Sequence, residues 1–123
     1  MLKLNQSEIQ LLEKYPRYSQ DGLGENAKIL FKIFNPLGNQ TWYVLEGEKM
    51  YDGKDWLLFG YVIGQFNEYG YFTLNELKEL RVPCYVLEEG GDYNEFIGYC
   101  GLEVDRSFKS MTPMAEILKE VQS

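Results

Sequence analysis

Carboxylates are the side chains in this sequence whose type and spacing could support chemistry. Four of them, Glu88, Glu89, Asp92 and Glu95, surround a Gly-Gly pair and carry enough oxygen atoms to bind a hard cation weakly. The same pattern is typical of a charged hairpin tip in solvent, because Gly-Gly pairs favour turns. We expect the second interpretation to hold and predict no metal site.

Two other short patterns resemble ligand sites without completing them. Asp52 and Asp55 match half of a calcium-binding loop, whose further oxygen ligands are missing. Gly22, Gly24 and Ala27 match the dinucleotide-binding pattern G-x-G-x-x-A, which works only between a strand and a helix. Here a predicted helix precedes the pattern and a predicted strand follows it. We predict solvated turn carboxylates in the first case and a loop in the second.

The absence of histidine restricts the enzymatic options further. No Ser-His-Asp or Cys-His mechanism is available, and neither is a zinc site that needs imidazole. Cys84 and Cys100 have no metal-binding or redox spacing, and a disulfide would require their strands to be neighbours. We expect two reduced thiols. A carboxylate pair of the glycosidase type stays open, but we predict no catalytic residue, no cofactor and no enzyme.

Charge narrows the class of partner. The chain has 123 residues, with 12 Lys and Arg against 19 Asp and Glu, for a net charge of −7. Residues 82–105 contain six acids and no basic residue. This acidity disfavours direct binding to nucleic acid or to an anionic membrane. The acidic segment either steers the chain toward a basic partner or keeps a sheet edge soluble by like charge, and we favour the second role.

Local patterns predict one α+β domain over residues 1–123, with a mainly antiparallel sheet and three short helices. Asn5 and Glu8 form a capping box, and Thr73 and Glu76 form another before a helix whose Leu74, Leu77 and Leu80 face inward. The last helix opens at residues 112–113. Strands are expected at 28–34, 41–46, 56–63, 85–87, 96–100 and 102–108.

Side-chain alternation assigns faces within these strands. Ile29, Phe31 and Ile33 should share a face, and Gly60 inside an apolar strand indicates a bulge or a close backbone approach. Trp42 and Tyr43 should point to opposite faces. Three short helices cover one sheet face but hardly two. Either the Trp42 ring or the Tyr43 ring should therefore lie on the less covered sheet face, where we expect self-association or a partner.

Four stretches occur in the order seen in a known family: YPRYSQ at 15–20, TWYVLEG at 41–47, LFGYV at 58–62 and EYGYFTLNEL at 68–77. In these stretches the chain resembles an uncharacterised family, a domain of unknown function found in bacteria, conjugative elements and phages. The family's acid-Arg-acid motif is matched only loosely, at residues 103–106. Because the family has no established catalytic residues, the resemblance implies a setting in mobile DNA and no reaction.

We therefore expect a small acidic non-enzymatic protein that binds a protein partner, as an accessory or counter-defence factor of a mobile element. One alternative is an acidic mimic of nucleic acid that blocks a DNA-binding protein. Another is a carboxylate-based enzyme or small-ligand binder. A cytoplasmic location is expected, and a homodimer stays open. The residues expected to contact a partner are Glu88, Glu89, Asp92, Glu95, Trp42 and Tyr43.

Overall fold

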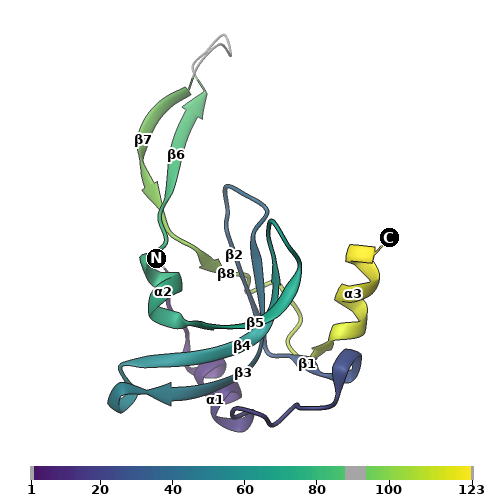
Figure 1. The fold of residues 1–123 in the computed structure, drawn as a ribbon. Helices are drawn as coiled ribbons and strands as arrows, with labels where there is room; N and C mark the ends of the chain where they lie inside the picture. Colours follow the sequence, from purple (N-terminus) through teal and green to yellow (C-terminus); the bar gives the residue numbers. More distant parts are fainter. Residues whose placement is uncertain (1, 88–93, 123) are drawn as a thin grey trace.

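A five-stranded antiparallel sheet, with strand order β5-β4-β3-β2-β8, forms the centre of the computed structural model, which describes residues 2–87 and 94–122 (Figure 1). The predicted α+β class with a mainly antiparallel sheet is confirmed. The strands of this sheet are β2 Phe31–Phe34, β3 Thr41–Met50, β4 Asp55–Ile63, β5 Glu68–Thr73 and β8 Glu103–Val104.

Two smaller strand pairs and three α-helices complete the described part of the chain. One pair joins β1 Lys28–Ile29 to β9 Thr112–Pro113, and the other joins β6 Val82–Leu87 to β7 Asn94–Cys100. The helices are α1 Gln6–Lys14, α2 Leu74–Glu79 and α3 Met114–Gln122, and short 3-10 turns occupy Gly24–Asn26 and Tyr51–Gly53. No helix in the described residues is long and apolar enough to cross a membrane.

The helix starts follow from local hydrogen bonds, as predicted. The backbone N–H of Glu8 donates to Asn5 Oδ1 at 2.9 Å, and the N–H of Asn5 donates to Glu8 Oε1 at 2.7 Å. Before α2, the N–H of Glu76 donates to Thr73 Oγ1 at 3.1 Å. Leu74 and Leu77 are buried, but Leu80 is 42% exposed because α2 ends one residue before it. The prediction that Leu80 faces inward is wrong.

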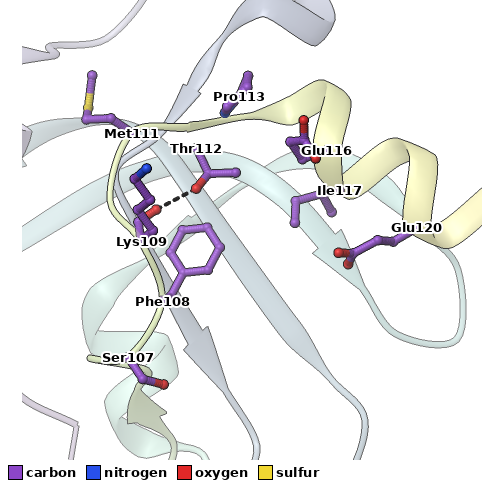
Figure 2. A pocket seen from close by; sticks show the side chains of 9 residues that line it. All are labelled: Ser107, Phe108, Lys109, Met111, Thr112, Pro113, Glu116, Ile117 and Glu120. Atoms are coloured by element: carbon purple, nitrogen blue, oxygen red, sulfur yellow. Dashed lines mark hydrogen bonds between the residues drawn. The ribbon is translucent and has the colours of Figure 1, made fainter.

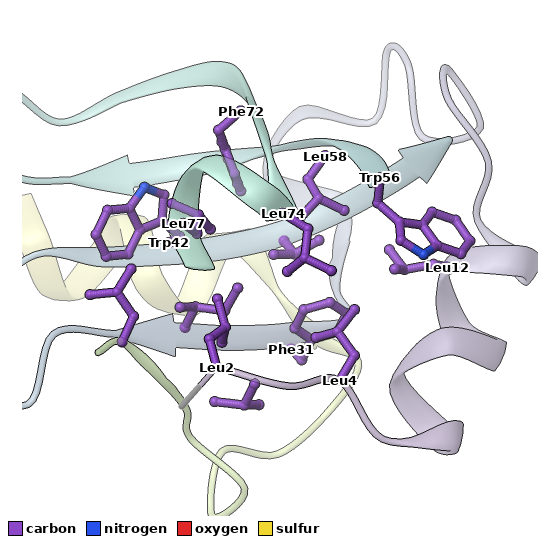
Figure 3. Close-up of a cluster of buried hydrophobic side chains, with 14 of the residues drawn as sticks. Leu2, Leu4, Leu12, Phe31, Trp42, Trp56, Leu58, Phe72, Leu74 and Leu77 are labelled. Carbon is purple, nitrogen blue, oxygen red and sulfur yellow. The ribbon is translucent and has the colours of Figure 1, made fainter. Parts of the chain in front are cut away.

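Each face of the sheet carries its own apolar cluster, because side chains alternate along β3 and β4. Trp56 and Leu58 belong to the first cluster, which α1 and α2 help to enclose (Figure 3). Tyr61 belongs to the second, which includes Met114 and Ile117 of α3. The expectation that the helices cover only one face is wrong in part, because α3 contributes to the cluster on the other face.

The residue pairing in the sheet is interrupted at two places. The predicted strand 28–34 is split at Leu30, which places Ile29 in the second cluster while Phe31 and Ile33 lie in the first. The shared face predicted for these three side chains is therefore wrong for Ile29. Between β3 and β4 the register shifts between Val44 and Glu46, which is a β-bulge.

The second interruption confirms the interpretation of Gly60. This residue pairs with Val44 next to the bulge, and a Cβ atom placed on it would lie 2.0 Å from the carbonyl oxygen of Tyr43. Only glycine permits so close an approach of two backbones. The strand predicted at 41–46 continues to Met50, and the strand predicted at 102–108 is limited to Glu103–Val104.

Two buried polar side chains fasten the segment 15–27 to the sheet. Glu46 is 2% exposed, and its two carboxylate oxygens accept the backbone N–H groups of Tyr18 and Gln20, each at 2.8 Å. The Gln20 amide donates to the carbonyl oxygens of Lys28 and Leu45, each at 2.8 Å, and accepts the N–H of Lys28 at 2.6 Å. Tyr18, Gln20, Leu45 and Glu46 lie within stretches of the family resemblance, so part of that pattern has a structural explanation.

Candidate functional site: the arm formed by β6 and β7

The strands β6 and β7 form an arm that projects from the rest of the molecule (Figure 1). They pair with each other and with no other strand of the described chain. Neither apolar cluster contains a residue of the arm whose side chain the structure describes. An isolated two-stranded hairpin is only marginally stable in water. A large apolar surface exposed on this arm therefore does not help the arm to fold.

One face of the arm nevertheless carries three exposed aromatic rings, which we call the aromatic face: Tyr85, Phe96 and Tyr99. Tyr85 pairs with Phe96 across the strands, with ring centroids 5.7 Å apart, and the Phe96 and Tyr99 rings are 5.3 Å apart. The exposed fractions are 54% for Tyr85, 50% for Phe96 and 65% for Tyr99. Exposed aromatic groups of this kind are typical of protein-binding surfaces.

A β-bulge in β7 builds the aromatic face. Residues three apart on a regular strand point to opposite faces, yet Phe96 and Tyr99 are in ring contact. The register shifts opposite Cys84 and Tyr85, which leaves Ile97 as the extra residue before Gly98. Gly98 has φ +130°, a conformation that side-chain-bearing residues rarely adopt. The sequence alone gives no sign of this phase change apart from the glycine.

A disulfide joins the two strands of the arm near its base. Cys84 and Cys100 are bonded, and their Cα atoms are 6.1 Å apart, within the range that a disulfide spans. The prediction of two reduced thiols is wrong for this structure, because β6 and β7 are neighbours with Val82 opposite Cys100. In the chain-entropy treatment, closing a loop of this length restricts the unfolded chain by about 3 kcal/mol.

The acids predicted to contact a partner are only partly described. Glu95 is exposed on β7 and pairs with Val86, whereas Glu88, Glu89 and Asp92 lie outside the described residues. The other two acids of segment 82–105 belong to the body of the molecule. Glu103 is in β8, and Asp105 lies 3.6 Å from the Lys32 ammonium. The six acids therefore do not share one surface element.

Hydrogen bonds account for the electrostatic state of Asp105. The hydroxyl and the backbone N–H of Ser107 both donate to its carboxylate, at 2.7 and 3.0 Å. These bonds, led by the hydroxyl and helped by Lys32, hold the pKa of Asp105 below its ordinary 3.8. Arg106 contacts Glu8 at 3.1 Å and the carbonyl oxygen of Lys3 at 2.8 Å. The acid-Arg pattern at 103–106 thus joins the last strand of the sheet to other elements.

The two aromatic residues predicted to contact a partner lie in the core. Trp42 is 7% exposed within the first cluster, and Tyr43 is 6% exposed within the second. They point to opposite faces as expected, but the Tyr43 ring packs beside Phe108, 5.9 Å between centroids. Burial raises the pKa of the Tyr43 hydroxyl, with the carboxylates of Glu120 and Asp105 adding to the effect. Neither ring reaches a partner without a change in the core.

A groove of about 530 Å³ runs between α3 and the segment before it (Figure 2). Phe108 and Ile117 supply apolar lining, and Glu116 and Glu120 stand four residues apart on α3. A catalytic acid pair flanks its substrate from two sides, whereas these two carboxylates come from one side of one helix. The groove therefore offers a weaker site than the arm.

The predicted turn carboxylates differ in their surroundings. Asp52 is exposed, but Asp55 is 6% exposed and its Oδ1 accepts the N–H groups of Trp56 and Asn75, at 2.7 and 3.0 Å. The expectation of a solvated Asp55 is wrong, because this carboxylate supports the start of α2. In the described residues, no three Cys, Asp or Glu side chains gather into a metal-binding group.

Comparison with known proteins finds no family model, no curated protein and no solved structure that matches the chain, so the resemblance to a family of mobile DNA stays a prediction.

Proposed function

We propose that this chain is a non-enzymatic binding protein that docks its β6–β7 arm on a protein partner. The partner offers an apolar groove for the aromatic face and Lys or Arg residues beside it for the acids of the arm. The observation that carries the proposal is the exposure of Tyr85, Phe96 and Tyr99, on a hairpin whose described residues belong to neither apolar cluster. Burying these rings on a partner removes apolar surface from water and fixes a marginal hairpin.

The acids of the arm support a partner with a basic rim. Glu95 is exposed and directly precedes Phe96 on β7, and the sequence carries Glu88, Glu89 and Asp92 between β6 and β7. Such charges speed association with an oppositely charged surface. An accessory or counter-defence role in a mobile element is part of the proposal, and only the resemblance supports it.

A mimic of nucleic acid is the weaker alternative. Such a mimic needs acids spread over one continuous surface to imitate phosphates, whereas Asp105 pairs with Lys32 in the body and Glu103 lies on β8. An aromatic face also has no counterpart in a phosphate array. The arm therefore favours contact between two proteins.

The test identifies the partner through the arm and then measures its affinity. A photo-crosslinking amino acid at Ile97, which is 61% exposed, labels what the arm touches in cells. The same group at Tyr51, which is 71% exposed in the turn between β3 and β4, is the matched control. A protein labelled from Ile97 and not from Tyr51 is then purified and its Kd is measured.

The variants Phe96→Ser and Tyr99→Ser should raise that Kd by about thirtyfold or more, as loss of a central aromatic contact does. Tyr51→Ser should leave it unchanged. An unchanged Kd for both arm variants would refute the proposal. If the double variant Glu88→Gln and Glu95→Gln abolished binding while the ring variants did not, the nucleic-acid mimic would replace the proposed docking of the aromatic face.

A further inference from the structure

The strand β5 is an edge of the five-stranded sheet and is separate from the arm. Only β4 pairs with it, so the backbone groups on its outer side have no strand partner in the described chain. Natural edge strands are commonly protected by Lys, Pro or a bulge. β5 has the sequence EYGYFT, with one charge at its first residue and none of these protections. Its outer edge is a template for another strand.

One face of β5 adds an exposed aromatic row to this edge. Tyr69 and Tyr71 are 42% and 47% exposed. Tyr69 packs against Tyr61 at 4.9 Å between ring centroids, and Tyr71 packs against Phe59 at the same distance. The Arg17 guanidinium lies 5.1 Å from the centre of the Tyr71 ring. These rings are therefore held in place at the open border of the sheet.

We propose that a second copy of this chain pairs with the edge of β5 in antiparallel orientation, about a twofold axis that passes midway between the Gly70 residues of the two copies. This inference is independent of the arm and goes beyond the proposed function. Residues opposite each other in an antiparallel pair point to the same face. A twofold axis perpendicular to the sheet must therefore place one residue directly opposite its own copy, and the axis passes midway between those two residues.

The register centred on Gly70 is self-complementary. It places Tyr69 of each copy opposite Tyr71 of the other, which extends the aromatic row across the boundary. It also places Glu68 opposite Phe72, so the two carboxylates do not face each other. Gly70 has no atom within 4 Å of where a Cβ would lie, which leaves room on the axis.

Sedimentation velocity of the full chain over a concentration series tests the dimer. The wild type should dimerise reversibly, and Tyr71→Lys should raise the dissociation constant by about tenfold or more, because it replaces a cross-strand ring pair with charge near the axis. Tyr51→Lys adds the same charge in an exposed turn and should leave the constant unchanged. A wild type that stays monomeric at every concentration would overturn the proposal.

A disulfide crosslink tests the register. In a Cys84→Ser and Cys100→Ser background, Gly70→Cys places two thiols opposite each other at the axis, at a Cα separation that a disulfide spans. Mild oxidation should convert this variant to a covalent dimer. Glu13→Cys, exposed on α1, is the control and should stay monomeric on a denaturing gel. A dimer that forms without the Gly70→Cys crosslink, or that Tyr99→Ser disrupts, places the interface elsewhere and also overturns the proposal.

Discussion

At the scale of single residues, buried polar groups explain how the segments of this fold are joined, and no reactive group among the described residues has a comparable role. Gln20, Glu46 and Asp55 are each at most 7% exposed, and each makes hydrogen bonds to backbone groups of another segment. Such groups are costly to bury without partners. Their role here is to fix where one segment meets another.

Glu46→Gln is predicted to lower the free energy of unfolding by about 1–3 kcal/mol. The amide offers one oxygen acceptor in place of two, and its NH₂ group would face a backbone N–H of Tyr18 or Gln20. Urea unfolding followed by tryptophan fluorescence measures the change. Glu48→Gln, two residues along β3 and exposed in an ion pair with Arg17, should cost well under 1 kcal/mol. Equal losses in the two variants would contradict this account of Glu46.

Sequence patterns predicted these polar residues less well than the apolar ones. The Asn5 and Glu8 capping box is predictable, because both partners lie within one helical turn. The partners of Glu46 are 28 and 26 residues away. No local pattern identifies contacts over that distance. The same limit explains the wrong expectation for Asp55, whose acceptor role depends on Asn75.

At the scale of elements, two bulges decide how strands present their side chains. The one beside Gly60 lets β3 and β4 approach closely, and the one at Ile97 brings Phe96 and Tyr99 to one face. The alternation of apolar and polar residues predicted where the strands lie. It assumes, however, that successive side chains alternate between the two faces of a strand without interruption. It therefore missed the aromatic face, and with it the strongest candidate site.

Gly60→Ala should destabilise the fold by about 3 kcal/mol or more, because the added methyl group collides with backbone that cannot move aside cheaply. Gly70→Ala provides the matched control. Gly70 pairs directly with Gly60 on the next strand, and space around it is open. Its replacement should change stability by less than about 0.5 kcal/mol. Thermal unfolding of both variants decides between a steric role for Gly60 and a general intolerance of side chains in this part of the sheet.

The disulfide gives the arm a second testable property. Cys84→Ser with Cys100→Ser should increase amide hydrogen exchange across β6 and β7, because a two-stranded hairpin without a crosslink opens more readily. Exchange in β3 and β4 should stay as in the wild type. Mass spectrometry after alkylation without reductant should find no reactive thiol in the wild type. Two alkylated cysteines would show that both thiols are reduced and would contradict the disulfide.

At the scale of the whole molecule, the core and the arm are separate in composition. Among the residues that the structure describes, neither apolar cluster includes one between Leu77 and Leu102. The first and last residues of the arm, Val82 and Cys100, are paired with each other. A variant with residues 82–100 replaced by a short glycine linker should therefore fold cooperatively, with its Tm shifted by less than about 4 °C. Calorimetry measures the shift, and a broad or absent transition would contradict the separation.

The pairing of Val82 with Cys100 also bears on how such a protein can change over generations. The two ends of the arm lie side by side where the chain leaves the body of the molecule and returns to it. Residues can therefore be added to the arm or lost from it without altering the spacing of the sheet strands. Mutations that alter the reach of the arm or its aromatic surface leave the packing of Trp42, Leu58 and Met114 untouched. If the arm binds a partner as proposed, the surface that chooses the partner and the core that sets the stability of the fold can then diverge independently.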